Sequence, residues 1–263
     1  MKYVLVTGAC GGIGRAVVKE LKNAGYYVFA LDLKCGERED NVMPIETDIT
    51  DENSVKCAYE KVKEVTNELY AVLHFAGVYA LNSLVEISEE KFKQIFEVNV
   101  FGVYRINKTF APMLKAGSRV LITTSELAPL DPLPFTGLYA ITKSSLDKYA
   151  YSLRMELQLL GVKVIALRPG AVNTGMLDVS TRDLDSFCEN TAYYSCNAKR
   201  FKKIVNGVEA RHITPERLAQ KSVKIIGRKN PKFVYSLNRN PLLLLLNILP
   251  KRMQTWIIKQ VLK

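Results

Sequence analysis

The sequence predicts an α/β protein built around a parallel sheet. Up to residue 170, short apolar runs alternate with longer segments of helical periodicity, which is typical of βαβ units with right-handed crossovers. The apolar runs are nearly continuous, as expected for strands that are covered by helices on both faces. The chain has 263 residues and is long enough to bury a sizeable core.

The predicted elements follow one another along the chain. The expected strands are 3–6, 27–31, 42–46, 70–75, 119–124, 162–167 and 232–235. Four helices are expected in this part of the chain: one from the glycine-rich turn to about residue 24, one over 51–66, one from 88 to about 115, and one over 137–160. Residues 171–213 are polar and irregular, and a further helix is expected at Thr214, with Pro215 in its first turn.

Composition excludes several classes of protein. Hydrophobic residues make up 48% and charged residues 24% of the chain, which excludes a disordered or fibrous protein. The longest apolar run, 242–246, is far shorter than the ~20 residues of a membrane-spanning helix. The N-terminus shows no signal peptide. Five scattered cysteines without a CxxC or Cys/His cluster predict neither disulfides nor a metal site, so a cytoplasmic location is expected.

Positive charge is concentrated in the C-terminal quarter. Residues 1–195 hold 21 Lys/Arg and 24 Asp/Glu, whereas residues 196–263 hold 16 Lys/Arg and only 2 Asp/Glu. Such an asymmetry indicates an anionic partner, either a membrane surface or a nucleic acid. No recognised nucleic-acid-binding motif supports the latter, and we expect no nucleic-acid partner.

A glycine-rich segment, Thr7 to Gly14, lies between the first expected strand and the first expected helix. Glycines let the backbone approach a pyrophosphate, and a helix N-terminus supplies free N–H groups. The segment therefore predicts a dinucleotide site. Asp32 ends the second strand, where a carboxylate accepts hydrogen bonds from a ribose and repels a 2′-phosphate. With no Lys or Arg in the loop before Gly14, we expect NAD to be favoured over NADP, although Lys34 could soften the preference.

Tyr139 and Lys143 are four residues apart in an expected helix and share one of its faces. A phenol with a pKa of about 10 is a poor acid or base at neutral pH. A nearby ammonium, together with a cationic nicotinamide, would favour the phenolate and lower that pKa. The pair thus offers a proton carrier in a chain whose two histidines, His74 and His212, lie in no motif.

Taken together, these motifs resemble the short-chain dehydrogenase/reductase family in its compact single-domain form. The family's order recurs over about residues 1–175, in the sequence TGxxxGIG, Asp32, Asp48-Ile49, Asn99, Ser125, YxxxK and the segment Pro169–Thr174. The resemblance implies a Rossmann-like, doubly wound parallel sheet of seven strands in one domain, residues 1–240. It also implies a substrate lid at 171–213 and a homodimer or homotetramer.

The resemblance assigns a role to each motif residue. Tyr139 would be the acid/base, Lys143 would hold the ribose and lower the tyrosine pKa, and Ser125 would bond the substrate oxygen. Asn99 would support the lysine through a water relay, and Asp48 and Ile49 would border the adenine. The expected cofactor-binding residues are Gly8, Gly12, Ile13, Gly14, Asp32, Asp48, Ile49, Ala76, Gly77, Asn99, Tyr139, Lys143, Pro169, Gly170, Val172 and Thr174.

Two positions depart from the family's pattern. Phe75 replaces the asparagine that usually precedes Ala76-Gly77, and we expect altered packing rather than lost chemistry there. The catalytic serine usually lies about thirteen residues before the tyrosine, at a position that Glu126 occupies here. Ser125, one residue earlier, ends a strand of the right composition, and Thr124 is the alternative.

The implied activity is hydride transfer between nicotinamide and a secondary alcohol or ketone, with a lipophilic substrate such as a hydroxysteroid. Two alternatives stay open: a reductase of 3-oxoacyl thioesters, and a non-catalytic nucleotide-sensing or membrane-associated protein of the same fold. The basic tail, residues 241–263, is amphipathic over 251–263. This pattern fits a helix lying in a membrane interface, a helix packed on the domain, or a subunit contact.

Overall fold

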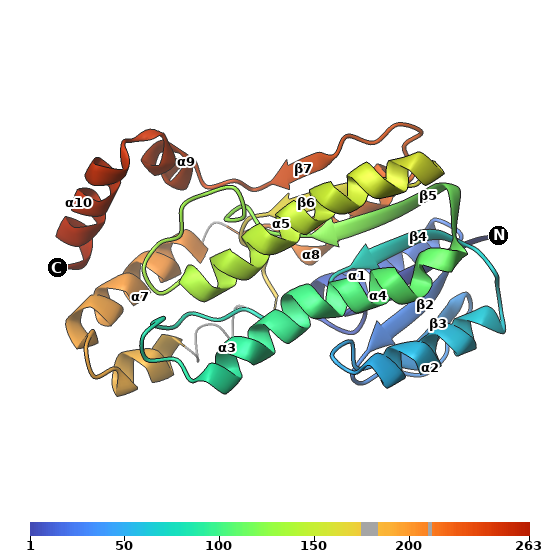
Figure 1. Cartoon of the computed structure of the whole chain (residues 1–263), viewed down its shortest axis with the longest axis horizontal. Helices are drawn as coiled ribbons and strands as arrows, with labels where there is room; N and C mark the ends of the chain where they lie inside the picture. Colours follow the sequence, from blue (N-terminus) through green and yellow to red (C-terminus); the bar gives the residue numbers. More distant parts are fainter. Residues whose placement is uncertain (175–183, 210–211) are drawn as a thin grey trace.

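The computed structural model describes residues 1–174, 184–209 and 212–263, and these are organised around an all-parallel, seven-stranded sheet (Figure 1). The strand order is β3-β2-β1-β4-β5-β6-β7. The strands are β1 (Lys2–Thr7), β2 (Tyr26–Asp32), β3 (Val42–Glu46), β4 (Leu69–His74), β5 (Leu114–Thr123), β6 (Lys163–Pro169) and β7 (Val234–Leu237). This is the predicted Rossmann-like, doubly wound arrangement, whose order reverses between β1 and β4. Ligands bind at such a point, outside the carboxyl ends of the strands.

Helices cover both faces of the sheet. One layer holds α1 (Gly12–Asn23) and α8 (Pro215–Ile226); the other holds α2 (Glu52–Lys63), α3 (Glu89–Phe96), α4 (Gly102–Phe110) and α5 (Gly137–Leu157). Successive side chains of a strand point to opposite faces of the sheet, so adjacent residues pack against different helix layers. Val4 packs with Val17 of α1, while Leu5 packs in the cluster of Val55 of α2. The near-continuous apolar runs of the sequence follow from this double burial.

Local sequence signals account for several helix starts. Asp51 accepts a hydrogen bond from the Asn53 backbone N–H at the start of α2, and the Ser88 and Thr214 side chains cap α3 and α8 in the same way. Pro215 occupies the first turn of α8, where its missing N–H costs nothing. These starts agree with the sequence expectations.

Two expectations about the elements were wrong. The helix expected from 88 to about 115 is divided into α3, the π-helical segment η1 (Glu97–Phe101), α4 and the 3-10 turn η2 (Ala111–Met113), and residues 114–115 already belong to β5. Pro112, which cannot donate a backbone hydrogen bond, lies in that turn. Residues 171–213 are also not wholly irregular, because they contain α7 (Ser195–Glu209), stabilised by the burial of Ala198 and Phe201.

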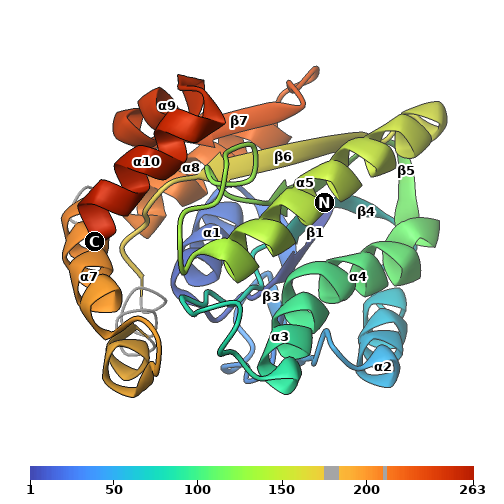
Figure 2. The same cartoon turned by 60° about the vertical axis from the view of Figure 1, so that its left-hand side comes forward.

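The C-terminal tail forms two further helices, α9 (Pro241–Ile248) and α10 (Lys251–Leu262), while a 3-10 turn, η3 (Gln158–Leu160), ends α5. Figure 2 shows α10 lying across α7. Leu262 is buried in the cluster formed by α7 and residues 184–188, and its carbonyl accepts a 2.6 Å hydrogen bond from Asn197 Nδ2. One face of the predicted amphipathic helix is thus packed on the domain. Over the described ranges, no helix is both long and apolar enough to cross a membrane.

Candidate active site

A cavity of about 190 Å³ lies at the carboxyl ends of the central strands. Its walls come from the segments that follow β4, β5 and β6, from α5, and from the later elements α7 and α9. Ten of the predicted site residues line it: Ile13, Ala76, Gly77, Ser125, Tyr139, Lys143, Pro169, Gly170, Val172 and Thr174. The structure therefore brings the predicted catalytic residues and much of the predicted cofactor site into one space.

Tyr139 and Ser125 meet across this cavity. Tyr139 lies on the first turn of α5, and Ser125 follows β5, so the helix that packs beside the strand brings the two together. Desolvation in the cavity, aided by the nearby Glu126 charge, raises the pKa of Tyr139 to about 12. A hydrogen bond from Ser125 lowers this pKa, but by less than desolvation raises it. The phenol is therefore held in its protonated form by the chain's own groups, contrary to the lowering that we expected. The arrangement suits donation of a proton to a substrate oxygen.

Lys143 lies one turn after Tyr139, and its Nζ is 5.6 Å from the centre of the tyrosine ring. This Nζ donates a 3.2 Å hydrogen bond to the Thr123 carbonyl. Burial lowers the pKa of Lys143 to about 8, because an ammonium loses hydration in the cavity wall. At neutral pH the side chain is still mainly charged, which suits an anionic or hydroxyl-rich ligand in the adjoining space.

Asn99 lies in the π-helical segment η1 and is fully buried. Its Oδ1 accepts a 2.8 Å hydrogen bond from the Val78 N–H, and its Nδ2 donates to the Val78 carbonyl and to Thr142 Oγ1. A Cβ added to Gly77 would lie 3.2 Å from Asn99 Oδ1 and 3.6 Å from Lys143 Nζ. Asn99 thus holds the segment after β4 against the lysine, while the water relay stays a prediction.

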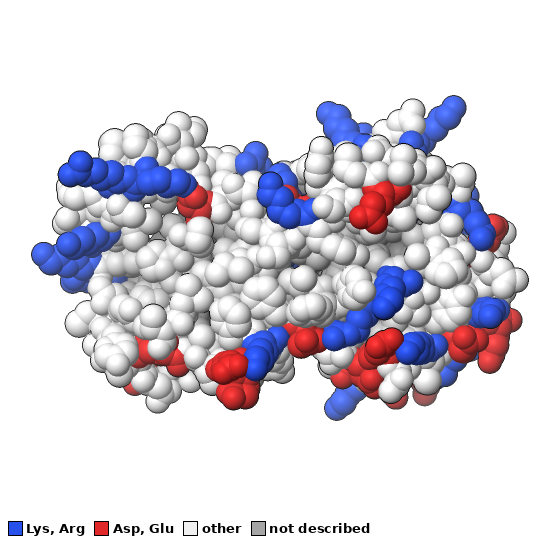
Figure 3. All heavy atoms as spheres, in the orientation of Figure 1, with Lys and Arg blue, Asp and Glu red and all other residues white. Residues whose placement is uncertain are grey.

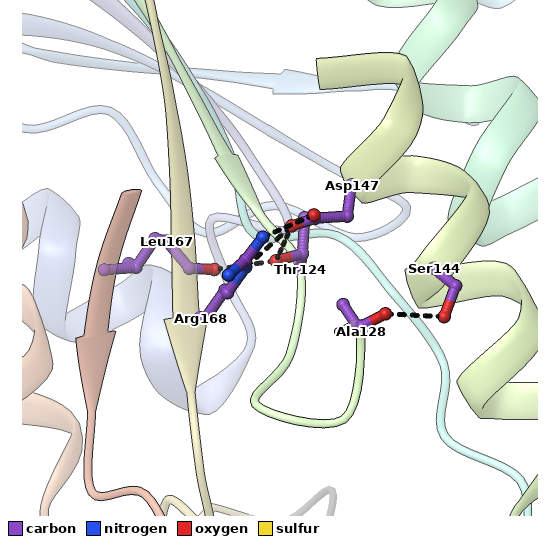
Figure 4. A network of polar contacts seen from close by, with 6 residues as sticks. All are labelled: Thr124, Ala128, Ser144, Asp147, Leu167 and Arg168. Carbon is purple, nitrogen blue, oxygen red and sulfur yellow. Dashed lines mark hydrogen bonds and ion pairs between the residues drawn. The ribbon is translucent and has the colours of Figure 1, made fainter. Parts of the chain in front are cut away.

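Thr124, the alternative to Ser125, forms polar contacts with two neighbouring elements (Figure 4). Thr124 Oγ1 lies 3.3 Å from both Asp147 Oδ1 and the Leu167 carbonyl. Asp147 in turn forms a two-pronged ion pair with Arg168, at 2.9 and 2.6 Å. Thr124 is therefore occupied in joining β5, β6 and α5, and Ser125 is the residue that bonds the phenol.

The glycine loop fits a dinucleotide. Gly8 has a φ of +69°, and an added Cβ would lie 2.5 Å from the Ala76 backbone nitrogen, so only glycine allows β1 and β4 to end this close together. An added Cβ on Gly14 would lie 1.9 Å from the Gly8 carbonyl oxygen. The N-cap of α1 is Gly11, which has no side chain that could bond the first N–H groups of this helix. Its first N–H groups are therefore available to a pyrophosphate.

Asp32 lies beside this loop and is held in place by two backbone donors. Its Oδ2 accepts from the Cys10 N–H and its Oδ1 from the Leu33 N–H, both at 2.8 Å. This geometry fits the predicted ribose site. The structure also brings a cation near it, because Arg15 Nη2 donates a 3.1 Å hydrogen bond to the Cys10 carbonyl. Our search for basic residues before Gly14 missed Arg15, which directly follows the motif.

Asp48 and Ile49 do not line the cavity among the described residues. Asp48 Oδ1 accepts hydrogen bonds from the N–H and hydroxyl of Thr50. Ile49 is buried, and an added Cβ on Gly102 would lie 2.6 Å from its Cδ1. Both residues therefore have local structural partners, and their contact with an adenine stays a prediction. Phe75 packs against the core cluster that contains Val4 and Val17, and altered packing relative to the family stays a prediction.

Several cavity residues were not singled out from the sequence. Glu126 is buried, lines the cavity and accepts a 2.6 Å hydrogen bond from the Asn240 N–H. The Tyr79 ring meets the Tyr139 ring edge-on at 4.5 Å. Leu243 comes from α9, more than a hundred residues after the catalytic motif. Only Glu126 carried a signal, since it occupies the position where the family usually has its serine.

The aromatic residues of the expected lid have mixed roles. Phe187 and Tyr194 pack around Phe135, at ring distances of 4.9 and 5.3 Å. Phe201 both packs on Phe135 and lines the cavity, whereas Tyr193 is 73% exposed. The lid expectation at 175–183 and 210–211 falls outside the described residues.

The fold and the Tyr–Lys–Ser–Asn arrangement define a nucleotide-dependent oxidoreductase, and comparison with known proteins agrees. A family model described as short chain dehydrogenase matches residues 2–185. The chain therefore belongs to the short-chain dehydrogenase/reductase family, whose members are NAD(P)-dependent enzymes acting on CH–OH groups. Solved structures show the same fold, such as a short-chain dehydrogenase from Streptomyces avermitilis with a TM-score of 0.78 at 19% identity, covering 99% of this chain and 93% of the other.

Relatives of known or assigned activity cover different shares of the chain. A 3-ketodihydrosphingosine reductase from Bacteroides thetaiotaomicron is 28% identical over 88% of this chain and 86% of its own length. Mouse estradiol 17-beta-dehydrogenase 2 is 33% identical over 66% of this chain, which spans only 49% of that protein. An NADPH-dependent 1-acyldihydroxyacetone phosphate reductase from Schizosaccharomyces pombe is 30% identical over 73% of this chain and 68% of its own length.

Proposed function

We propose that the protein interconverts a lipophilic secondary alcohol and its ketone, with NAD favoured over NADP. The observation that carries this proposal is that Tyr139 and Ser125 line one cavity whose other walls are mostly apolar. The apolar side chains come from five separate parts of the chain: Phe75, Val78, Leu127, Leu133, Val172, Phe201, Ile204, Val205 and Leu243.

The chain's own residues would manage the proton and the orientation of the substrate. When bound, the nicotinamide cofactor supplies or accepts the hydride. Tyr139 donates its proton to the carbonyl oxygen during reduction and takes a proton from the hydroxyl during oxidation. Ser125 orients the same oxygen, and Lys143 would hold the ribose. The glycine loop and Asp32 would hold the adenosine half.

Glu126 adds a restriction on the substrate. Its carboxylate is part of the cavity wall and directly follows Ser125. A negative charge there disfavours a phosphate or carboxylate close to the reacting carbon. This supports neutral or cationic lipophilic substrates, such as those named for the sphingosine and estradiol relatives, over the phosphate ester named for the yeast relative.

The reaction itself can be tested with a panel of secondary alcohols and ketones that includes hydroxysteroids, sphingoid ketones and 3-oxoacyl thioesters. We expect NADH formation or consumption with steroids or sphingoids. Turnover of the thioesters alone would favour the alternative reductase. No turnover with any of them would leave a nucleotide-binding role.

The proton carrier is tested with Tyr139→Phe. Removal of a positioned acid/base should lower kcat by about 10²- to 10⁴-fold. Cofactor binding, measured by NADH fluorescence, should change little. The matched control is Tyr79→Phe, because that ring contacts Tyr139 in the same cavity. If Tyr139→Phe keeps near-normal turnover, another residue carries the proton.

A further inference from the structure

The helix α9 presents a row of exposed apolar side chains. Leu242, Leu245 and Ile248 are 66%, 60% and 79% exposed. They recur every three residues and therefore lie along one side of the helix. The opposite side is attached to the domain, where Asn247 Oδ1 accepts a 2.7 Å hydrogen bond from the Asp131 N–H and Leu243 lines the cavity. The exposed row is thus held in a fixed orientation.

The neighbouring helix α10 has a similar division. Gln254 and Leu262 are buried on its inner side. The outer side carries Met253 and Trp256, which are 50% and 63% exposed. Arg252 and Lys259 lie at helical spacing beside Trp256, so basic side chains flank the indole. An amphipathic helix in a bilayer interface combines aromatic and basic side chains in this way.

The charge of this region favours an anionic occupant. No acidic residue follows Glu216 in the sequence, whereas Arg239, Arg252, Lys259 and Lys263 lie in or beside α9 and α10. Lys251 also lies there, but it forms an ion pair with Asp131. In Figure 3 the uppermost surface at the upper left is uncharged, basic side chains run across and below it, and one acidic group lies at the end of the basic stripe. Two copies of so basic a surface would repel each other in a symmetric pairing. The acidic headgroups of a bilayer would instead be attracted, and the acyl region would take up the leucines.

We propose that the exposed apolar residues Leu242, Leu245, Ile248, Met253 and Trp256, named here the tail face, dock on an anionic lipid bilayer. The docking does not depend on which substrate the enzyme uses. Docking also has a consequence for the substrate, and this consequence rests on the proposed function. Because Leu243 of α9 lines the cavity, only the helix α9 would separate the bilayer from the cavity. A lipophilic substrate would then have a short path from membrane to site.

Vesicle binding by the full-length protein tests the proposal. The probes are vesicles of phosphatidylcholine alone and of phosphatidylcholine with phosphatidylglycerol. Trp256 is the single tryptophan of the chain, so its fluorescence reports directly on the tail face. We expect a blue shift and co-sedimentation with the anionic vesicles at low salt, partial release at high salt, and poor binding to neutral vesicles.

Two variants separate the apolar and charged contributions. Leu242→Ser/Leu245→Ser/Ile248→Ser should weaken binding by at least tenfold, while Leu159→Ser/Leu160→Ser, which alters exposed leucines at the far end of α5, should not. Arg252→Gln/Lys259→Gln/Lys263→Gln should reduce binding by roughly 10²-fold, at about fivefold per charge. Turnover of a water-soluble substrate without vesicles should be unchanged in every variant. A failure of membrane docking can therefore be distinguished from a failure of the proposed enzymatic function.

The proposal is overturned if the full-length protein stays in the supernatant with anionic vesicles at low salt. It is also overturned if the leucine triple variant binds as the unaltered protein does. A change in oligomeric state of that variant, measured by sedimentation velocity without lipid, would show that a second copy covers the tail face instead.

Discussion

Glu126 is the residue that most distinguishes this site from its family's pattern. Burial raises the pKa of Glu126, and its charge contributes to the raised pKa of Tyr139, because a carboxylate disfavours a nearby phenolate. Alcohol oxidation requires the deprotonated tyrosine. Glu126→Gln keeps an acceptor for the Asn240 N–H and removes the charge, so the rising limb of the oxidation pH profile should move to lower pH.

The pH dependence of kcat/KM for both directions measures this effect. Glu86→Gln is the control, since Glu86 also accepts a backbone hydrogen bond, from the Ala192 N–H at 2.7 Å, but is not among the cavity residues. If the pH profile of oxidation is the same in Glu126→Gln as in the unaltered protein, the Glu126 carboxylate does not raise the pKa of Tyr139.

Asp32 should decide the choice of dinucleotide. A 2′-phosphate near its carboxylate would be repelled, so NADH should bind about tenfold more tightly than NADPH. Asp32→Asn should narrow this difference, and Arg15→Gln should widen it by removing a cation beside the same loop. Fluorescence titration with both reduced cofactors measures the ratio. A preference for NADPH in the unaltered protein would mean that Arg15 or Lys34 dominates.

At the scale of elements, the ion pair between Asp147 of α5 and Arg168 of β6 joins the catalytic helix to the strand that leads into Pro169-Gly170 (Figure 4). Both side chains are largely buried, at 13% and 20% exposure. Asp147→Asn leaves a buried guanidinium without its counter-charge and should cost about 3 kcal/mol of unfolding free energy.

Denaturant unfolding measures this cost, with Glu89→Gln as the matched control. Glu89 pairs with Lys93 on the surface, where both side chains are about 70% exposed, so its loss should cost under ~0.5 kcal/mol. Equal costs for the two variants would mean that the Asp147–Arg168 pair stabilises no more than a surface contact.

At the scale of the whole molecule, the tail face can be compared with another part of the described surface that exposes apolar side chains but carries a different charge. Besides the tail face, α4 and α5 expose Tyr104, Tyr151 and Met155 in the nearly neutral first three quarters of the chain. Self-association through this face meets little electrostatic repulsion, so we expect the predicted homodimer or homotetramer to use it. Tyr104→Glu/Tyr151→Glu should give a smaller species in sedimentation velocity, whereas Tyr193→Glu, on a more exposed tyrosine outside α4 and α5, should not. A monomeric unaltered protein would contradict the expectation.

Local sequence patterns were sufficient for much of this architecture. The strand–helix alternation predicted the parallel sheet, because apolar periodicity follows directly from burial on two faces. The glycine loop, Asp32 and the Tyr139–Lys143 pair could be placed because each depends on short-range spacing or on a position at the end of a strand. The division of the helix at η1 was missed, since one wide turn leaves little periodic signal, and the end of the helix at η2, after Phe110, was placed too late.

What the sequence by itself determined is therefore the fold class and the chemical groups of the site. The tertiary structure decided the environment of those groups. Desolvation of the Tyr139 hydroxyl in the cavity sets the direction of its pKa shift, and long-range packing brings Glu126, Phe201 and Leu243 into the same cavity. The physical reason is that desolvation and cavity shape depend on residues far apart in the chain, whose meeting no local spacing encodes.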